Sequence, residues 1–583
     1  MATTAISDWP STFDNSLLKD LRKEETSRPF AESRQVTGAH YTIVRPTVPA
    51  PSPSLVIVAE DVAELIGISS ADVETKEFLS IFSGGGVPES VSCWATAYGA
   101  SFAGQYGGQR GDGRAISIGQ VNGMEVQLKG AGVTPFSREF DGRAVLRSCV
   151  REFLASEHMH ALGVPTTRAL SIVLSGDKVA RGWYNDDGRE VMQYESGAVG
   201  TRVAASFLRI GQFELFWQRD EMDLLEELAQ HALDREYSHL KVQHPSEPPS
   251  GLLVKMFREI CERQAVLIAE WLRVGYAQGN MNSDNAAIGG VTLDYGPFAF
   301  MEKFIPTYQP WVGGGMPYCF GQQPQAAAVN LSGLAGVFVE LVERVAKAEG
   351  RSGAEVHELL EEVRASVSHG YVDTFYEANN ENCRRKLGFG VWDDDAQGLW
   401  DELFALMSGK CGAGGVDFTM FFRSLADAEV PSGAGEAAVE ATGMEVDADD
   451  ADDAAEVGPV GGDDRYLNFL RRAALEPIES WPAEHRAEWI GWAKRYGKRV
   501  ATEGVAAEER AEMMRLANPK FILRNSMAVE AYEAAARGDF TIVKELHAVL
   551  SKPYDEQTPE ATKRWAQLTP QWARGRPGIT YMS

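Results

Sequence analysis

The sequence predicts an α+β protein with two lobes, an N-terminal segment before them and a helical C-terminal extension after them. Two predicted hairpins enclose one predicted helix within residues 91–200, which is typical of a small lobe built from a sheet and a helix. From about residue 205 to 425 the apolar residues recur with the helical period, which favours a larger helical lobe. The predicted divisions are therefore 1–90, 91–200, 201–430, 431–464 and 465–583.

Turn signals define the elements of the small lobe. Ala115–Val121 and Met124–Lys129 flank Asn122-Gly123, a dipeptide typical of a two-residue hairpin turn. A second hairpin is expected from residues 168–174 and 179–184 around a Ser-Gly-Asp turn at 175–177. Between the hairpins an amphipathic helix is expected over 143–162, because a glycine and a proline follow it closely.

Residues 431–464 differ in composition from the rest of the chain. They are rich in Ala, Gly, Asp and Glu, and no Lys or Arg occurs between Arg423 and Arg465. We expect a solvated acidic linker here, with an acidic lure for a basic partner as the alternative. Residues 465–583 return to a helical pattern with several tryptophans and form the predicted extension.

Bulk composition restricts the classes of function. A hydrophobic content of 44% supports a large core, and a net charge of −27 argues against binding to nucleic acid or to anionic membranes. No apolar run is expected to reach the roughly 18–20 residues of a membrane span. The six cysteines include no C-x-x-C pair, so reduced thiols are expected. Asp8, Pro10 and Asp14 interrupt any signal peptide, and no clear mitochondrial presequence is visible, which favours the cytoplasm.

Four separated segments contain the parts of an ATP site. Lys129 lies in a predicted strand, Glu152 lies in the predicted helix, and an Asn-Ser-Asp-Asn loop at 282–285 precedes Asp294-Tyr295-Gly296. A polyphosphate needs a cation, an anion that orients the cation, and oxygen ligands for Mg²⁺. The order of these segments predicts a protein-kinase-like two-lobed fold that binds ATP and Mg²⁺. A solvated lysine and glutamate remain the alternative for this pair.

Glycines and arginines extend the predicted nucleotide site. Gly111 and Gly113 would let the backbone approach phosphate oxygens, and Arg114 would add charge, although a plain surface turn is the alternative. Asp141 and Gly142 precede the predicted helix, where they would either cap it or touch the nucleotide.

Two further arginines are candidates for phosphate binding. Arg202 and Arg209 are seven positions apart and would share one face if their segment is helical. Such a pair suits bidentate capture of phosphate, and ordinary surface arginines are the alternative.

The candidate metal ligands are Asn285 and Asp294, and Asp284 is the candidate catalytic base. A standard protein-kinase loop places its catalytic Asp about five positions before the metal-binding Asn. Here Asp284 and Asn285 are neighbours, so the loop is not that of a standard protein kinase.

Several long motifs together resemble the selenoprotein O family. They cover nearly the whole chain except the acidic linker, and they are Asp112-Gly113-Arg114-Ala115, Met281-Asn282-Ser283-Asp284-Asn285 and Leu293-Asp294-Tyr295-Gly296-Pro297-Phe298, with the runs 127–138, 141–148, 163–170, 518–525 and 552–557. The chain departs from the family at Ser101-Phe102-Ala103, at Gln278 and in the loop after Phe298. None of these departures removes a candidate phosphate or metal ligand.

The resemblance implies a pseudokinase that binds ATP in a flipped orientation and transfers AMP to Ser, Thr or Tyr hydroxyls of proteins, releasing pyrophosphate. By motif, Glu152 would orient Lys129 and Asp284 would act as the base. The other implied roles are phosphate binding by Lys129, Arg202 and Arg209, completion of the nucleotide pocket by Gly111, Gly113, Arg114, Asp141 and Gly142, and Mg²⁺ binding by Asn285 and Asp294. The resemblance also implies a mitochondrial location for a eukaryotic source.

Two other functions stay open at this point. One is transfer of the γ-phosphate by an atypical kinase, and the other is a non-catalytic ATP-binding scaffold. Many members of the family carry a redox-active cysteine or selenocysteine near the C-terminus, whereas the last cysteine here is Cys411. We therefore expect no disulfide between the tail and the active-site loop.

Overall fold

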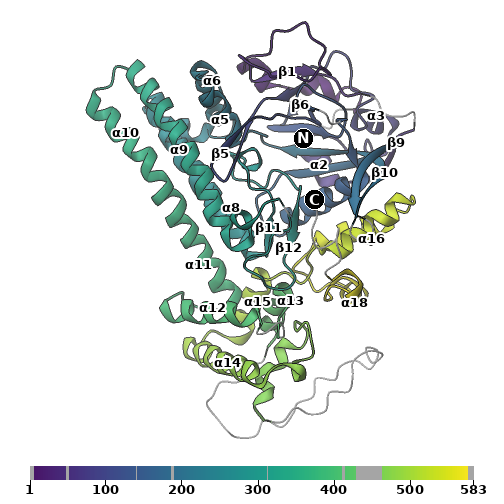
Figure 1. The fold of residues 1–583 in the computed structure, drawn as a ribbon, viewed down its shortest axis with the longest axis vertical. Helices are drawn as coiled ribbons and strands as arrows, with labels where there is room; N and C mark the ends of the chain where they lie inside the picture. Colours follow the sequence, from purple (N-terminus) through teal and green to yellow (C-terminus); the bar gives the residue numbers. More distant parts are fainter. Residues whose placement is uncertain are drawn as a thin grey trace.

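The computed structural model describes residues 5–47, 52–138, 141–184, 189–311, 313–409, 414–428 and 462–574. Residues 431–461 of the predicted acidic linker lie outside the described residues. Figure 1 shows a sheet-containing lobe, a lobe of long helices beside and below it, and further helices at the C-terminal end. The predicted α+β, kinase-like architecture with a helical C-terminal extension is confirmed.

One eight-stranded antiparallel sheet forms the small lobe. Its main path runs in the order β1-β3-β6-β7-β10-β9-β2, and β8 pairs with β10. The strands are β1 (Tyr41–Val44), β2 (Ser54–Val58), β3 (Cys93–Thr96), β6 (Ala115–Val121), β7 (Met124–Lys129), β8 (Ala144–Val145), β9 (Arg168–Tyr184) and β10 (Glu190–Ala204). Two small sheets pair β4 (Gly99–Phe102) with β5 (Gln105–Gln109) and β11 (Tyr276–Gln278) with β12 (Phe298–Phe300).

The first predicted hairpin is confirmed as β6 and β7, and the second is wrong. Strand β9 continues through the Ser-Gly-Asp run and pairs with β10, with Leu174 opposite Ala198 and Lys178 opposite Ser196. The three residues between them face the single Gly197, which is a bulge. A Cβ on Gly197 would lie 2.0 Å from the Asp177 carboxylate, so the extra residues fold over a position without a side chain.

The N-terminal segment contributes to the same sheet. Strand β1 pairs with β3, and β2 pairs with β9 at the other end of the strand order. Helices α1 (Ser16–Asp20), α2 (Glu60–Leu65) and α3 (Lys76–Phe82) belong to this segment, and α4 (Leu146–Ala161) is the helix predicted between the hairpins.

The larger lobe is helical, as predicted. It contains α5 (Ile210–Gln218), α6 (Met222–Arg235), α7 (Ser238–Gln243), α8 (Pro249–Arg273), α9 (Gln323–Ala348), α10 (Gly353–Ala365), α11 (Thr374–Leu387), α12 (Asp394–Met407) and α13 (Phe418–Ala426), with a π-helical turn at Ser366–Asp373. In the described part of the chain, Phe320–Ala348 is long and apolar enough to cross a membrane, contrary to expectation. Just over half of its apolar window, 56%, is buried within the fold, as in the core helix of a globular protein.

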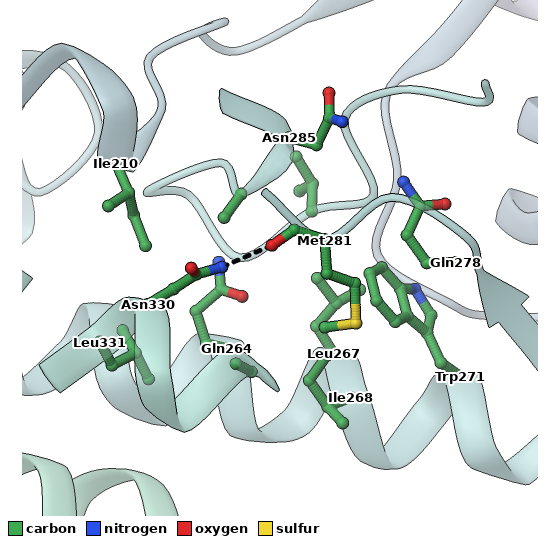
Figure 2. Close-up of a pocket in the computed structure, with 13 residues that line it drawn as sticks. Ile210, Gln264, Leu267, Ile268, Trp271, Gln278, Met281, Asn285, Asn330 and Leu331 are labelled. Atoms are coloured by element: carbon green, nitrogen blue, oxygen red, sulfur yellow. Dashed lines mark hydrogen bonds between the residues drawn. The ribbon is translucent and has the colours of Figure 1, made fainter. Parts of the chain in front are cut away.

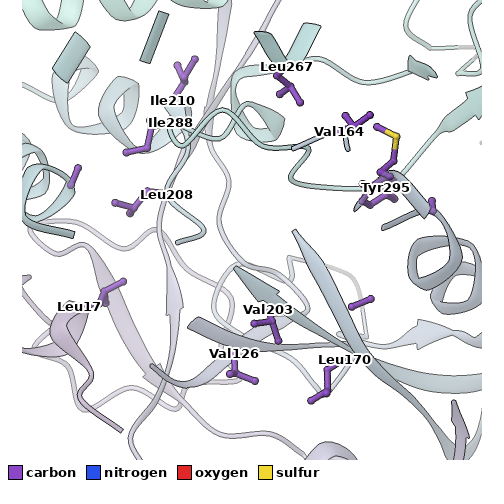
Figure 3. Close-up of a cluster of buried hydrophobic side chains, with 14 of the residues drawn as sticks. Leu17, Val126, Val164, Leu170, Val203, Leu208, Ile210, Leu267, Ile288 and Tyr295 are labelled. Atoms are coloured by element: carbon purple, nitrogen blue, oxygen red, sulfur yellow. The ribbon is translucent and has the colours of Figure 1, made fainter. Parts of the chain in front are cut away.

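The extension contains α14 (Ala483–Glu503), α15 (Ala507–Ala517), α16 (Asn525–Ala536), α17 (Thr541–Leu550) and α18 (Pro559–Trp565). It contributes to two apolar clusters. Trp489 and Trp492 of α14 pack with α12 and α13, whereas Leu546 of α17 joins the large cluster that also contains the sheet. Figure 3 shows members of that large cluster from the strands, such as Val126 and Val203, and from helix α8, such as Leu267.

Candidate active site

Lys129, Glu152 and Asp294 meet where the two lobes face each other. The Lys129 Nζ atom, at the end of β7, donates to Glu152 Oε2 of α4 at 2.6 Å and to Asp294 Oδ1 at 2.6 Å. The structure thus brings together a strand lysine, a helix glutamate and the Asp of the Asp-Tyr-Gly triplet. This cation is held between two carboxylates at a site that is largely shielded from water.

Arg202 belongs to the same cluster but reaches it from a strand. It lies in β10, directly opposite Gln127 of β7. Its guanidinium donates to Asp294 Oδ1 at 3.0 Å and to Gln127 Oε1 at 2.5 Å, and it lies 3.5 Å from Glu152 Oε1. Two cations therefore share two carboxylates.

Arg209 occupies the residue before α5 rather than a second turn of the same helix. The prediction that Arg202 and Arg209 share a helical face is wrong, because β10 extends to Ala204. Arg209 Nη1 donates to the Asp284 backbone carbonyl at 3.1 Å, and its Nη2 lies 3.6 Å from Asp112 Oδ1. Its guanidinium stacks 4.2 Å from the centre of the Tyr98 ring. Sheet pairing and a helix start thus bring both arginines to the site.

Asp284 and Asn285 lie in a short 3₁₀ turn, Ser283–Asn285, that buried side chains hold in place. The Glu214 carboxylate of α5 accepts hydrogen bonds from Ser283 Oγ and from Ser101 Oγ of β4. Burial raises the pKa of Glu214, although both hydroxyl groups stabilise its charged form.

A small cavity lies behind this turn. Asn330 of α9 donates to the Met281 carbonyl at 2.8 Å, as Figure 2 shows. The cavity has a volume of about 20 Å³, which suits one water molecule. Its lining includes Gln264, Gln278 and Asn285, so the cavity lies between the turn and the helical lobe.

The electrostatic environments of the two site aspartates are opposite. Burial raises the pKa of Asp284 despite the attraction of Arg209, and its Oδ1 is buried without a hydrogen-bond partner among the described residues. Burial also opposes ionisation of Asp294, but Lys129 and Arg202 together hold its pKa well below the usual range. Asp294 is therefore a firmly ionised carboxylate, whereas Asp284 is a more basic one.

Two other buried atoms of the site have no hydrogen-bond partner among the described residues. They are Arg202 Nε and Arg209 Nη2, and both are donors. Native proteins leave few buried polar atoms unsatisfied, and an absent ligand is one reason for such atoms. The unsatisfied donors mark a place that can receive an anion.

The glycine-rich segment before β6 is fixed by close packing. Gly111 has φ +144, and a Cβ there would lie 2.3 Å from the Phe136 ring. Gly113 would bring a Cβ within 2.9 Å of the Phe136 carbonyl. Arg114 is exposed at the start of β6, and its charge helps lower the pKa of Asp294.

Asp141 and Gly142 lie ahead of α4 without capping it directly. Asp141 pairs with Arg181 of β9 at 2.8 Å, and this arginine lowers its pKa. Gly142 has φ +68, and a Cβ there would lie 2.2 Å from the Gly132 backbone. No described contact joins Asp141 to the Lys129 cluster.

The side chains that could hold a cation are Asn285 and Asp294. The described residues contain no group of three or more His, Cys, Asp or Glu residues arranged for a metal. Asn285 directs its amide Nδ2 to the Asn280 carbonyl at 3.3 Å, which leaves its side-chain oxygen for another partner. A carboxylate and an amide oxygen fit Mg²⁺, which usually takes its other ligands from water and substrate phosphates.

Sequence reasoning missed three supporting residues. Gln127 lies two positions before Lys129, and strand alternation places the two side chains on one face, so this signal was available. Glu214 and Asp112 carry no comparable local signal, because their partners Ser283 and Arg209 are far away in the chain.

The described cysteines are all buried and free, namely Cys93, Cys149, Cys261, Cys319 and Cys383. Burial raises the pKa of the Cys93 thiol to about 11 and that of Cys149 to about 12. Cys411 and the tail from residue 575 lie outside the described residues, so the expected lack of a tail disulfide stays a prediction.

Comparison with known proteins shows the family to which this chain belongs. A sequence profile described as protein adenylyltransferase SelO matches residues 26–551. The chain is 36% identical to a protein nucleotidyltransferase YdiU of Rhodopirellula baltica, over 98% of both chains. It is 37% identical to a protein of the same name from Methylobacillus flagellatus, over 98% of this chain and 99% of the relative. The resemblance seen in the motifs is thereby confirmed, and the chain belongs to the SelO family of protein adenylyltransferases.

Proposed function

We propose that this chain transfers AMP from ATP to hydroxyl groups of protein side chains, with Mg²⁺ as cofactor and pyrophosphate as the leaving group. The nucleotidyltransferase class follows from the family, and ATP is the substrate that adenylyl transfer implies. The hydroxyl acceptor, the metal and the role of each residue are the parts that we propose.

The observation that carries the proposal is the convergence of three cations on the inner part of the site. Lys129 and Arg202 share Asp294 Oδ1, and Arg209 lies beside Asp284. Arginine binds phosphate oxygens through paired N–H groups. The two arginines together with the Lys129 ammonium suit the β and γ phosphates, which leaves the α phosphorus nearer the acceptor.

Each site residue then has a definite task. Lys129, Arg202 and Arg209 bind the two outer phosphates, and Glu152 keeps Lys129 in position. Asn285 and Asp294 would hold Mg²⁺, which neutralises phosphate charge when bound. Charge that develops on the departing pyrophosphate is met by the same fixed cations, so little reorganisation is needed.

Asp284 accepts the proton of the acceptor hydroxyl. The acceptor oxygen forms a bond to the α phosphorus, and the bond from that phosphorus to the β-phosphate oxygen breaks. The elevated pKa of Asp284 supports this role, because a more basic carboxylate is a better proton acceptor. The proton passes to the carboxylate of Asp284, a residue that is partly exposed.

The other two functions are less well supported. A standard γ-phosphate kinase separates its base from its metal-binding Asn, whereas Asp284 and Asn285 are neighbours in one turn. A non-catalytic scaffold would not need a carboxylate with a buried oxygen that has no hydrogen-bond partner among the described residues, because such an oxygen costs the folded protein free energy.

Labelled ATP distinguishes these functions. The protein is incubated with Mg²⁺ and a protein acceptor, using ATP labelled on either the α or the γ phosphate, with Asp284→Asn as the inactive control. We expect label on protein from the α position only, together with release of pyrophosphate. Protein label from the γ position alone would contradict adenylyl transfer, and binding without either label would favour a scaffold.

A further inference from the structure

Helix α4, which carries Glu152, is held along its outer side by the C-terminal extension. Near the start of α4, Arg151 Nη1 donates to Asn525 Oδ1 of α16 at 3.0 Å. Farther along, the Phe153 ring lies 5.2 Å from the ring of His547 in α17. Near its end, His158 Nδ1 donates to the Leu550 carbonyl at 3.0 Å. These contacts span about two turns of the helix.

The His158 contact is one between neutral groups. Burial lowers the pKa of His158 to about 4, so the ring is uncharged at neutral pH and Nδ1 carries the proton. The residue after α4, Leu162, is held as well, because Tyr554 donates its hydroxyl proton to the Leu162 carbonyl at 2.9 Å. The extension therefore contacts α4 from Arg151 to the residue that follows its C-terminal end.

Arg151 is the unusual member of this interface. Its side chain is buried, with 4% of the residue exposed, and its hydrogen bonds in the described part of the chain go to an amide oxygen and a backbone carbonyl rather than to a carboxylate. Its Nη2 donates to the Phe298 carbonyl at 3.0 Å, and its guanidinium lies 4.5 Å from the centre of the Phe298 ring. A buried cation without an anion is costly to retain, which calls for a role other than stability.

Phe298 and Asn525 connect Arg151 to two different parts of the chain. Phe298 begins β12, shortly after Asp294, and Asn525 begins α16 of the extension. Arg151 also immediately precedes Glu152, which pairs with Lys129. One buried side chain thus joins the Glu152 helix, the segment after Asp294 and the extension.

The extension is itself fixed to the helical lobe. Arg524, next to Asn525, pairs with Asp417 at 2.7 Å, and both side chains are at most 3% exposed. Lys386 of α11 donates to Asn518 Oδ1 at 2.8 Å. The extension consequently links α4 to the helical lobe through buried polar contacts.

We infer that the C-terminal extension is an intramolecular brace that sets the position of α4, and that Arg151 is the positioning residue through which it keeps Glu152 on Lys129. This inference rests on the proposed function for its kinetic test only. Arg151 contacts neither nucleotide nor acceptor in this account and acts through Glu152.

The test uses Asn525→Ala, which removes one partner of Arg151, and Asn525→Asp, which offers it a carboxylate. Glu545→Gln is the matched control, because Glu545 lies in α17 but bonds Arg564 and Trp565 of the extension. We expect Asn525→Ala to lower kcat/KM for ATP by roughly 10-fold, the effect of losing one charge-assisted hydrogen bond. Asn525→Asp should retain activity, and Glu545→Gln should match the wild-type protein.

The Glu152→Gln background separates positioning from general damage. If Arg151 acts through Glu152, Asn525→Ala should cause little further loss of kcat/KM once Glu152 is replaced. An equal loss in both backgrounds, or a melting temperature lowered with unchanged kcat/KM, would overturn the inference.

Amide hydrogen exchange gives a readout that does not depend on activity. We expect faster exchange in residues 146–161 of Asn525→Ala than of the wild-type protein or Glu545→Gln. Unchanged exchange there would refute the brace even if adenylyl transfer is established. Conversely, a wild-type protein without transfer activity would refute the proposed function and leave the exchange result to decide the brace.

Discussion

Replacing Asp284 by asparagine should stabilise the protein while abolishing its activity. Asp284 Oδ1 is buried without a hydrogen-bond partner among the described residues, and burial raises the pKa of the carboxyl group. Protonation of Asp284 is therefore more favourable in the folded than in the unfolded state, so keeping the carboxylate charged at neutral pH costs stability. Asparagine has nearly the same shape and no charge, so this cost is removed.

The magnitude follows from the surroundings of the carboxylate. Asparagine still places a polar atom at the position of Oδ1, so the substitution removes only the part of the cost that comes from burying a charge, on the order of 1–3 kcal/mol. Part of that gain is offset because the attraction between Asp284 and Arg209 is lost, although the Arg209 bond to the Asp284 backbone carbonyl at 3.1 Å remains. We expect a net gain of about 1 kcal/mol, or an increase in Tm of about 1–2 °C for a chain of this size.

The pH dependence of this stability difference follows from the direction of the pKa shift. Because the folded pKa lies above the unfolded one, the destabilisation by Asp284 is fully present above the folded pKa. It disappears as the pH falls below the unfolded value of about 4. The Tm difference between Asp284→Asn and the wild-type protein should therefore be largest at neutral pH and shrink on acidification.

Thermal unfolding from pH 4.5 to 8, together with the α-label assay, checks both halves of this prediction. The rate of transfer should fall by about 10²–10⁴-fold, the contribution typical of a general base. A lower Tm for the variant at neutral pH would show that the carboxylate stabilises the fold. Wild-type turnover in the variant would remove Asp284 from the base role.

Four further predictions follow from the same geometry. Asp294→Asn should lose about 1–3 kcal/mol of stability at neutral pH, measured by denaturant unfolding; because its pKa is held well below the usual range, this difference should begin to shrink below about pH 4 and vanish only at far lower pH, below the folded pKa. Arg202→Met and Arg209→Met should each weaken ATP binding roughly 10–100-fold and AMP binding far less, measured by calorimetry; equal losses would contradict contact with the outer phosphates. Gly111→Ala should lower Tm, since its Cβ would overlap the Phe136 ring at 2.3 Å. Transfer activity should be insensitive to dithiothreitol, because the described thiols are buried and free; strong activation by reductant would point to another thiol.

Local patterns were sufficient for elements formed by neighbouring residues. The Asn122-Gly123 turn gave the β6–β7 hairpin at the predicted positions, because loop length and residue type determine such a turn. Helix α4 also lies within its predicted bounds. The Ser-Gly-Asp run had the same appearance as a turn, but its conformation was decided by Gly197 on the opposite strand.

Local patterns could not predict the contacts between segments that are distant in the sequence. Arg202 reaches Asp294 through strand pairing with β7, whereas Arg209 contacts the Asp284 carbonyl from a helix start, so the spacing of seven was misleading. Asp294 pairs with both Lys129 and Arg202, although these three residues are far apart in the sequence. The contact between Arg151 and Asn525 joins two residues that no local signal relates.

The charge of the whole chain and the charge of its site have opposite consequences for the nucleotide. A net charge of −27 repels ATP, and salt screens that repulsion at distances beyond about 10 Å. In the site, Lys129 and Arg202 are balanced by Glu152 and Asp294, so without a ligand the cluster has little net charge. Phosphates that bind Lys129 and Arg202 release Asp294 from both, and the freed carboxylate can then hold a cation. The nucleotide and Mg²⁺ should therefore bind cooperatively, because the phosphates draw Lys129 and Arg202 away from Asp294 and Mg²⁺ takes their place there.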